Sequence, residues 1–276
     1  MSWFMEADPG VPLPVADGIP TLERALRMER AAEVRRVEPG RVVVLRQAAE
    51  AYGVQLGLAR GAIARAEELH RLAPSLDRAF PLTRLTVRPD EVGDTSQEVA
   101  ILPPVLIEIK DRAQLGAADA LVLSSAFYHV VEQPRWLVNA PSWRDYLLPP
   151  LKTVAKAPAI PPAPLLPATS DEQSVWQEAV RRGYVAGEEQ AVAIVRAGLS
   201  RLTRDVVGMV TYHTLLRQGM VTLPIQSRSD SAVGIGADGK SMAVHTRTYR
   251  IAIRPGFQGD PARWRALVGP AAGGVQ

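Results

Sequence analysis

The sequence predicts an α+β fold that is rich in helix, with long glycine-striped helices and a small C-terminal antiparallel sheet. Three observations lead to this class. Residues 170–219 contain no proline and repeat small or apolar residues at helical spacing. Residues 42–72 carry a second pattern of the same kind. After Gly219 the pattern changes to the alternation that is typical of strands.

The amino-acid composition limits the classes of protein to which the chain can belong. The chain has 276 residues and 47% hydrophobic residues, enough to bury a core. A net charge of +3 from 32 cations and 29 acids is close to balance, so we expect no direct nucleic-acid binding. With 0 cysteines there is no disulfide framework, thiolate metal site or cysteine nucleophile. We find no apolar stretch long enough to span a bilayer and no signal-peptide pattern, so we expect the export signal to be absent from this sequence.

Proline and glycine divide the chain into four parts. We expect a flexible N-terminal segment at residues 1–20 and a helix pair with short strands at 21–148. A proline-rich strap follows at 149–169, and a long helical segment with β-hairpins at 170–276. Residues 21–268 are expected to form one compact unit.

The second of these parts, residues 21–148, begins with two helices. One is expected from Thr21, as its cap, to Val37, with Pro39 and Gly40 ending it. The other spans 42–72 and has small residues every fourth position, at Ala49, Gly53, Gly57 and Gly61. A second small stripe lies later in the chain at Gly183, Gly187 and Ala191. The two stripes predict either two helices packed at close backbone distance or two helices that each face a different bulky neighbour.

Short strands are expected at 99–102 and 105–109, with turns near Pro89 and Asp94. Residues 120–131 fit either a strand or a helix, and we favour a strand that extends to Val138. A short helix capped by Ser142 follows. The strap after it is predicted to be extended, either lying over the domain or serving as a ligand for an aromatic groove.

The long helical segment is predicted to start with a capping box of Ser170 and Gln173 and to stop at Gly219. A kink or break near Gly198 is expected, because glycine costs about 1 kcal/mol relative to alanine in a helix. One face is small or apolar from Trp176 to Leu216, and the opposite face carries charged residues from Glu178 to Arg217, Asp205 among them.

Strands are predicted after this helix at 220–226, 232–235, 242–246 and 249–253, with a tight turn at 237–240 and a short helix opened by Asp260. The turn overlaps a literal match to the phosphate-loop pattern, from Gly234 to Lys240 and Ser241. A phosphate loop must open a helix, yet the following residues alternate like a strand, so a hairpin turn is the favoured interpretation.

No catalytic constellation is visible. The four histidines, His70, His129, His213 and His245, have no metal-ligand spacing, and no serine lies in a nucleophile elbow. We therefore expect no catalytic residue, no metal site and no cofactor, and we expect that the protein is not an enzyme.

Several short sequence motifs, taken in their order along the chain, resemble those of a known protein family. They occur in order as Leu102-Pro103-Pro104-Val105, Trp143-Arg144-Asp145-Tyr146-Leu147, Trp176, Gly183, Gly187 with Gln190-Ala191, Arg201-Leu202-Thr203-Arg204-Asp205, Gly208-Met209, Tyr212, Gly219-Met220-Val221 and Arg250-Ile251. Together they resemble the DotC/TraI family of outer-membrane core-complex components of type IVB secretion and conjugation systems.

This resemblance implies a non-enzymatic scaffold in the periplasm, associated with the outer membrane through a lipid or through partners. Family members assemble with DotD-like and DotH-like subunits into a ring that serves DNA or effector export. They are typically lipoproteins, and the absence of cysteine here departs from that pattern. We expect six interface residues: Trp143, Asp145, Tyr146, Arg201, Arg204 and Asp205. Two other classes stay open, a nucleotide-binding protein that uses 234–241 and a periplasmic glycan- or ligand-binding module.

Overall fold

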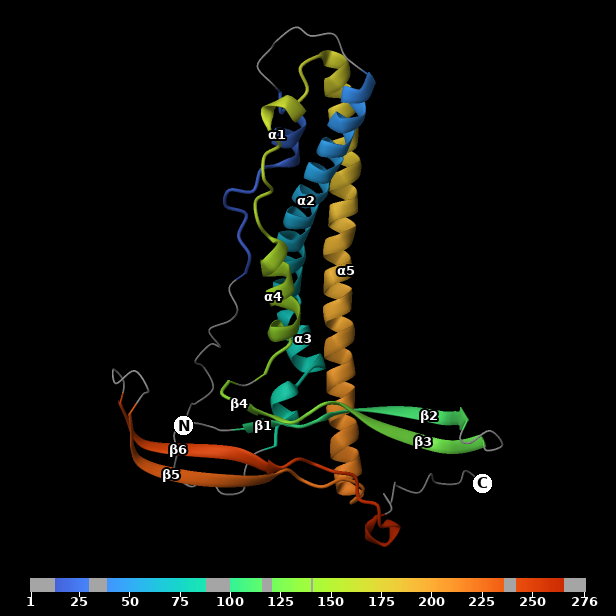
Figure 1. Ribbon diagram of the computed structural model, residues 1–276, viewed down its shortest axis with the longest axis vertical. Helices are drawn as coiled ribbons and strands as arrows, with labels where there is room; N and C mark the ends of the chain where they lie inside the picture. The colour runs from blue at the N-terminus through green and yellow to red at the C-terminus, as the bar shows by residue number, and fades with distance from the viewer. Residues whose placement is uncertain are drawn as a thin grey trace. The chain divides into compact units, whose positions relative to one another are not determined.

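The structure, a computed structural model, describes residues 13–29, 39–87, 100–115, 121–139, 141–235 and 242–265. It confirms the α+β class, with long helices and three two-stranded antiparallel sheets in the described part of the chain. The chain divides into two compact units, each built from two separate stretches (Figure 1). The helical unit comprises Met1–Phe80 and Ser142–Leu202, and the ribbon unit comprises Pro81–Pro141 and Thr203–Gln276.

Helix α1 covers only Leu22–Leu26, which is shorter than the helix predicted from Thr21 to Val37. Thr21 is its cap as expected, since its side chain accepts a hydrogen bond from the Arg24 N–H. Two carbonyls near its end are used by other side chains: the indole of Trp176 donates to Ala25 O and the amide of Gln173 donates to Leu26 O. These bonds dock α1 on a distant helix. Residues 30–38, with the rest of the predicted helix, lie outside the described residues.

Helix α2 spans Pro39–Arg71, and α3 follows at Ala73–Ala79. Pro39 begins α2, so the prediction that it ends the preceding helix was wrong. A proline is well suited to a first helical turn, because its missing N–H would have no partner there.

Helix α5 spans Ser170–Arg217 without interruption, so the break expected near Gly198 was wrong. A methyl group added at Gly198 would lie 2.9 Å from the Leu147 side chain, so this glycine permits close packing instead of breaking the helix. The helix stops at Gly219 as predicted, with φ of +70° and a hydrogen bond from Met220 N to Leu215 O.

The cap of α5 differs from the predicted pair of Ser170 and Gln173. Thr169 Oγ1 accepts from Glu172 N, and the Glu172 carboxylate accepts from Ala168 N. The capping residues therefore lie one position earlier, because Gln173 is already engaged with α1.

The two glycine stripes meet, which confirms the paired-helix alternative. Along α2 and α5, which run side by side in Figure 1, added methyl groups at Gly53, Gly57, Gly183 and Gly187 would collide with backbone atoms of the other helix. At Gly61 the same methyl would lie 2.9 Å from Ala191 Cβ. The helices thus approach backbone to backbone, and the dispersion contacts offset the low helix propensity of glycine.

Helix α4 spans Arg144–Val154 and includes Pro149 and Pro150, so these two residues, expected in the extended strap, are helical. Burial of Leu147, Leu148 and Leu151 holds this segment in place despite the missing N–H groups. The strap starts only at Ala155 and contains the short 3-10 helix η2, Ala163–Leu165.

Among its described residues, the ribbon unit contains three two-stranded sheets. They pair β1 (Ala100–Leu102) with β4 (Arg135–Leu137), β2 (Val105–Leu115) with β3 (Leu121–Glu132), and β5 (Ile225–Ile235) with β6 (Met242–Ile253). The strands expected in the middle of the chain are confirmed, with β2 longer than predicted. The four strands expected after Gly219 form only two, because each long strand continues through its expected interruption. The short helices η1, Leu82–Leu85, and η3, Pro261–Arg263, complete the unit.

The core of the ribbon unit joins the end of α5 to the base of β2 and β3. Tyr212, Leu215 and Val221 are buried with Leu106. A methyl group at Gly208 would lie 2.7 Å from Leu106 O, so glycine lets strand β2 approach the helix. The Tyr212 hydroxyl donates to Thr222 O, and burial raises the pKa of Tyr212 to about 12.

Candidate partner interface

Trp143 fixes α4 to α3 inside the helical unit. Its side chain is 1% exposed, and its indole N–H donates to Asp77 Oδ1 at 2.7 Å. Arg144 reaches the same carboxylate oxygen at 3.0 Å and places its guanidinium 4.5 Å from the Trp143 ring centroid. In this chain Trp143 is thus a packing residue, and little of it is available to a partner.

Asp145 and Tyr146 also have roles within the helical unit. Asp145 Oδ2 accepts from Ser142 N at 2.9 Å, while Ser142 Oγ accepts from Arg144 N at 3.2 Å. This reciprocal pattern caps α4 and confirms Ser142 as a capping residue. Tyr146 is 9% exposed, and Arg201 of α5 lies over its ring at 5.5 Å from the centroid. Arg201 itself is exposed.

Arg204 and Asp205 join α5 to strand β3 in the ribbon unit. Asp205 has a side chain only 3% exposed, which corrects its predicted place on the water-facing side of the helix. Arg204 donates to Asp205 Oδ1 through Nε at 2.8 Å and to Glu132 Oε1 through Nη2 at 2.8 Å. The arginine neutralises the buried carboxylate, which would otherwise be costly to desolvate.

A second buried carboxylate lies in the helical unit, next to the strap. Glu172 is 2% exposed and accepts from Arg41 Nε at 2.7 Å. Arg41 also donates to two carbonyls of the strap, Pro164 O and Leu166 O. The hydrogen bond from Arg41, with help from the Ala168 and Thr169 backbone, lowers the pKa of Glu172 below its ordinary value. The strap is therefore bound by its own chain.

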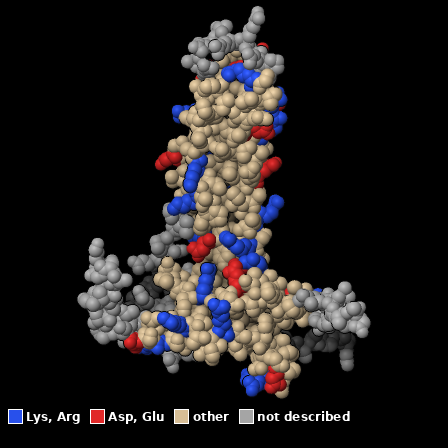
Figure 2. Space-filling view, in the orientation of Figure 1, with Lys and Arg blue, Asp and Glu red and all other residues tan. Residues whose placement is uncertain are grey.

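An apolar stripe on the outward face of α5 was not predicted. We define the α5 stripe as Val185, Val192 and Leu199, whose side chains are 55%, 40% and 38% exposed. Their seven-residue spacing is the signal that the sequence offered, because residues seven apart lie on one helical face. On the face drawn in Figure 2, charged side chains along the helical unit are separated by broad uncharged areas. Exposed apolar area of this kind is typical of surfaces that other proteins cover.

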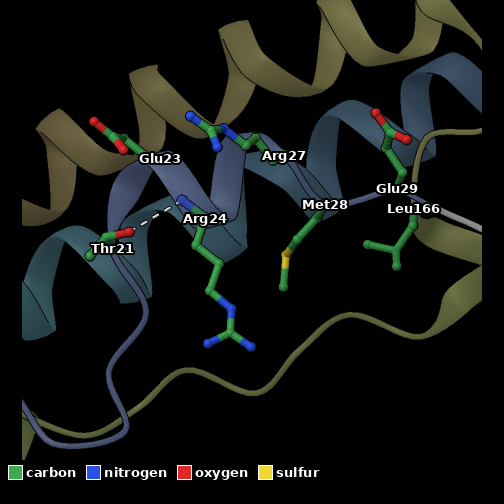
Figure 3. A pocket seen from close by; sticks show the side chains of 7 residues that line it. All are labelled: Thr21, Glu23, Arg24, Arg27, Met28, Glu29 and Leu166. Atoms are coloured by element: carbon green, nitrogen blue, oxygen red, sulfur yellow. Dashed lines mark hydrogen bonds between the residues drawn. The ribbon is translucent and has the colours of Figure 1, made fainter.

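A shallow hollow of about 510 Å³ lies beside α1, lined by Thr21, Glu23, Arg24, Arg27, Met28, Glu29 and Leu166. Its lining holds two acids, Glu23 and Glu29, and two cations, Arg24 and Arg27. Figure 3 shows the guanidinium groups of Arg24 and Arg27 pointing in different directions. They do not converge on a common point, so the hollow lacks the paired cations that an anionic ligand requires.

The phosphate-loop match falls between two paired strands. Gly234 pairs with Ala243 and Ile235 pairs with Met242 in the antiparallel ladder of β5 and β6. Residues 236–241, including the predicted turn, lie outside the described residues. Strand β6 begins directly after Ser241, so the helix that a phosphate loop must open is not there.

The described residues contain no group of three metal-ligating side chains. Among the same residues, no helix combines the length and the apolar character needed to cross a membrane. His213 contacts the Leu85 carbonyl, at 2.8 Å from Nε2, and so has a structural role.

These features define an α+β protein built on a glycine-packed helix pair and two-stranded ribbons, with apolar surface left on its longest helix. The model of the TraI family, type IV secretory system proteins of conjugal DNA–protein transfer, matches residues 39–266. The chain belongs to this family, and it is thus a component of a type IV secretion system related to conjugation. No curated protein matches the chain.

Proposed function

We propose that this chain is a structural subunit of the outer-membrane core complex of a type IVB secretion system, which serves conjugation or effector export, and that it has no enzymatic activity. The observation that carries the proposal is the family match, which extends over nearly all of the described helices and strands. The α5 stripe supports it, because a scaffold subunit needs surface that partners cover.

The partners of this proposal are DotD-like and DotH-like subunits, assembled with several copies of this chain into a ring in the periplasm at the outer membrane. Membership of a type IV secretion family supports a place in the cell envelope. Of the six residues expected at the interface, Asp145 and Arg201 are exposed, but Arg201 lies over Tyr146 on a different face of α5 from the α5 stripe. We therefore propose that the stripe contacts a partner, whereas Trp143, Tyr146 and Asp205 stabilise the chain itself.

The test is to purify the chain with and without its co-expressed DotD-like and DotH-like neighbours and to measure mass by light scattering. We expect a large hetero-assembly with the neighbours. Val192→Lys should reduce the amount of hetero-assembly at least tenfold. Val44→Lys, at a valine of α2 that is 48% exposed against 40% for Val192, should leave the assembly intact. A monomer that ignores the neighbours would overturn the proposal. Nucleotide binding lost in Lys240→Ala, or tight peptidoglycan binding, would favour the other two classes.

A further inference from the structure

The ribbon unit holds two long ribbons of matched size. Strands β2 and β5 have 11 residues each, and β3 and β6 have 12 each. In the described part of the chain neither ribbon pairs with a third strand. An isolated two-stranded ribbon is marginally stable in water, and its edges present unpaired N–H and C=O groups to other strands.

The edges of the β2–β3 ribbon differ in their protection. Strand β2 carries exposed charges at Glu108, Lys110 and Asp111, and Asp111 has φ of +50°, which distorts that edge. Charges and backbone irregularities of this kind block edge-to-edge pairing. Strand β3 has no Asp, Glu, Lys or Arg from Leu121 to Val131. The outer edge of β3 therefore lacks these protections.

The β5–β6 ribbon has charged residues that oppose edge-to-edge pairing only in the half that is farther from its predicted turn. Its charged residues are Arg228, Asp230, Arg247 and Arg250, and the outer stretches 231–235 and 242–246 contain no Asp, Glu, Lys or Arg. The two ribbons also differ in the sign of their net charge. The β2–β3 strands carry three acids against two cations, Lys110 and Arg112, and the β5–β6 strands carry three arginines against one acid. The ribbons thus match in length and carry net charges of opposite sign.

The geometry points to head-to-tail strand pairing between copies of this chain, in which the β3 edge of one copy adds to the β5–β6 ribbon of the next. Pairing over the full length would form roughly ten main-chain hydrogen bonds, the number that a typical protein interface carries. Two different surfaces meet, so a pair of copies still has one free surface of each kind, and the contact repeats into a ring or filament. This inference rests on the proposed function and identifies a second copy as one partner.

The absence of cysteine makes a cross-linking test direct. Ala126→Cys places a thiol at an exposed position midway along β3, and Ser229→Cys and Thr248→Cys place thiols midway along β5 and β6, where these two residues face each other. Chains with different substitutions are mixed and treated with a short thiol-specific cross-linker. The experiment is run on the purified full chain and on the complex with its neighbours.

We expect a covalent dimer when Ala126→Cys is mixed with Ser229→Cys or Thr248→Cys, at a yield at least tenfold above that with Val44→Cys at an exposed position on α2. When the thiol is placed by Ser124→Cys instead, the covalent dimer should still form. The further substitution Ala126→Lys in that variant should abolish the dimer. Cross-linking of Ala126→Cys to itself, to a different subunit only, or to nothing in both preparations would overturn the inference. Light scattering reports the hetero-assembly separately, so a failed ribbon contact is distinguishable from a failed proposed function.

Discussion

Gly57 of α2 lies directly against the main chain of Tyr184 on α5. A methyl group added at Gly57 would be 2.7 Å from the Tyr184 carbonyl carbon, well inside van der Waals contact. The two helices are packed through their backbones at this point. Separation of the helices is the only way to accommodate a side chain, and this relationship leads to the first prediction.

Gly57→Ala should destabilise the helical unit by about 1–3 kcal/mol, because overpacking exceeds the gain in helix propensity of about 1 kcal/mol. Gly40→Ala, in the same helix but with nothing near the added methyl, is the matched control and should be neutral or stabilising. Thermal unfolding followed by circular dichroism measures both. Equal stability of the two variants would contradict the close packing of α2 on α5.

Glu172→Gln should weaken the binding of the strap to the helical unit by about 1.5–3 kcal/mol, which is what a hydrogen bond to a charged group contributes. The loss arises because Arg41 loses its charged partner, at 2.7 Å from Nε. Limited proteolysis within 155–169 measures strap release, which should be faster in the variant. Arg65→Gln, which breaks an exposed pair with Glu68, should leave the strap unchanged.

The same carboxylate predicts a pH dependence. The pKa of Glu172 is lower in the folded chain than its ordinary value of 4.5, chiefly because Arg41 donates a hydrogen bond to the charged form. Its stabilising contribution is therefore complete above pH 4.5 and is lost as the pH falls through the folded pKa. The melting temperature of the native chain should fall more steeply below pH 4.5 than that of Glu172→Gln. Parallel curves would show that Glu172 is not the responsible group.

Asp205→Asn should cost about 1–3 kcal/mol, because it weakens a buried, charge-assisted hydrogen bond with Arg204. Glu132→Gln removes the other acidic partner of Arg204, but its side chain is 41% exposed. An exposed pair contributes about 0–1 kcal/mol, so Glu132→Gln should be nearly neutral. Denaturant unfolding of the two variants compares them, and a larger loss in Glu132→Gln would reverse this assignment.

Trp143→Phe should destabilise the chain by about 1–3 kcal/mol, because the indole hydrogen bond to Asp77 is lost from a buried site. Assembly with the secretion partners should survive at temperatures where the variant is folded. Unfolding and light scattering on the same sample separate the two effects. Loss of assembly without loss of stability would restore Trp143 as an interface residue.

Much of the fold followed from local patterns. Helical spacing located α2 and α5, and the alternation after Gly219 located the β5–β6 ribbon. Thr21 caps the start of α1 through its side chain, and Gly219 ends α5 because glycine adopts a positive φ readily. Boundaries that depend on distant partners were wrong: α1 stops early where α5 side chains take its carbonyls, and α4 extends through Pro149 because its leucines are buried.

The candidate interface was less predictable than the fold. The sequence marked Trp143, Tyr146 and Asp205 as special, but three-dimensional packing determines that they face inward. The α5 stripe was overlooked, although its seven-residue spacing was readable, because periodicity alone does not tell which apolar residues find a partner.

The sequence by itself determined the helix-rich α+β class, the two small-residue stripes and the ordered strings of the secretion family, because each depends on local spacing or residue identity. The tertiary structure alone decided that the stripes face each other, that Gly198 packs a continuous helix and that Arg41 and Arg204 neutralise buried carboxylates. The physical reason is that spacing fixes the face of an element, whereas its partner depends on contacts between residues far apart in the chain.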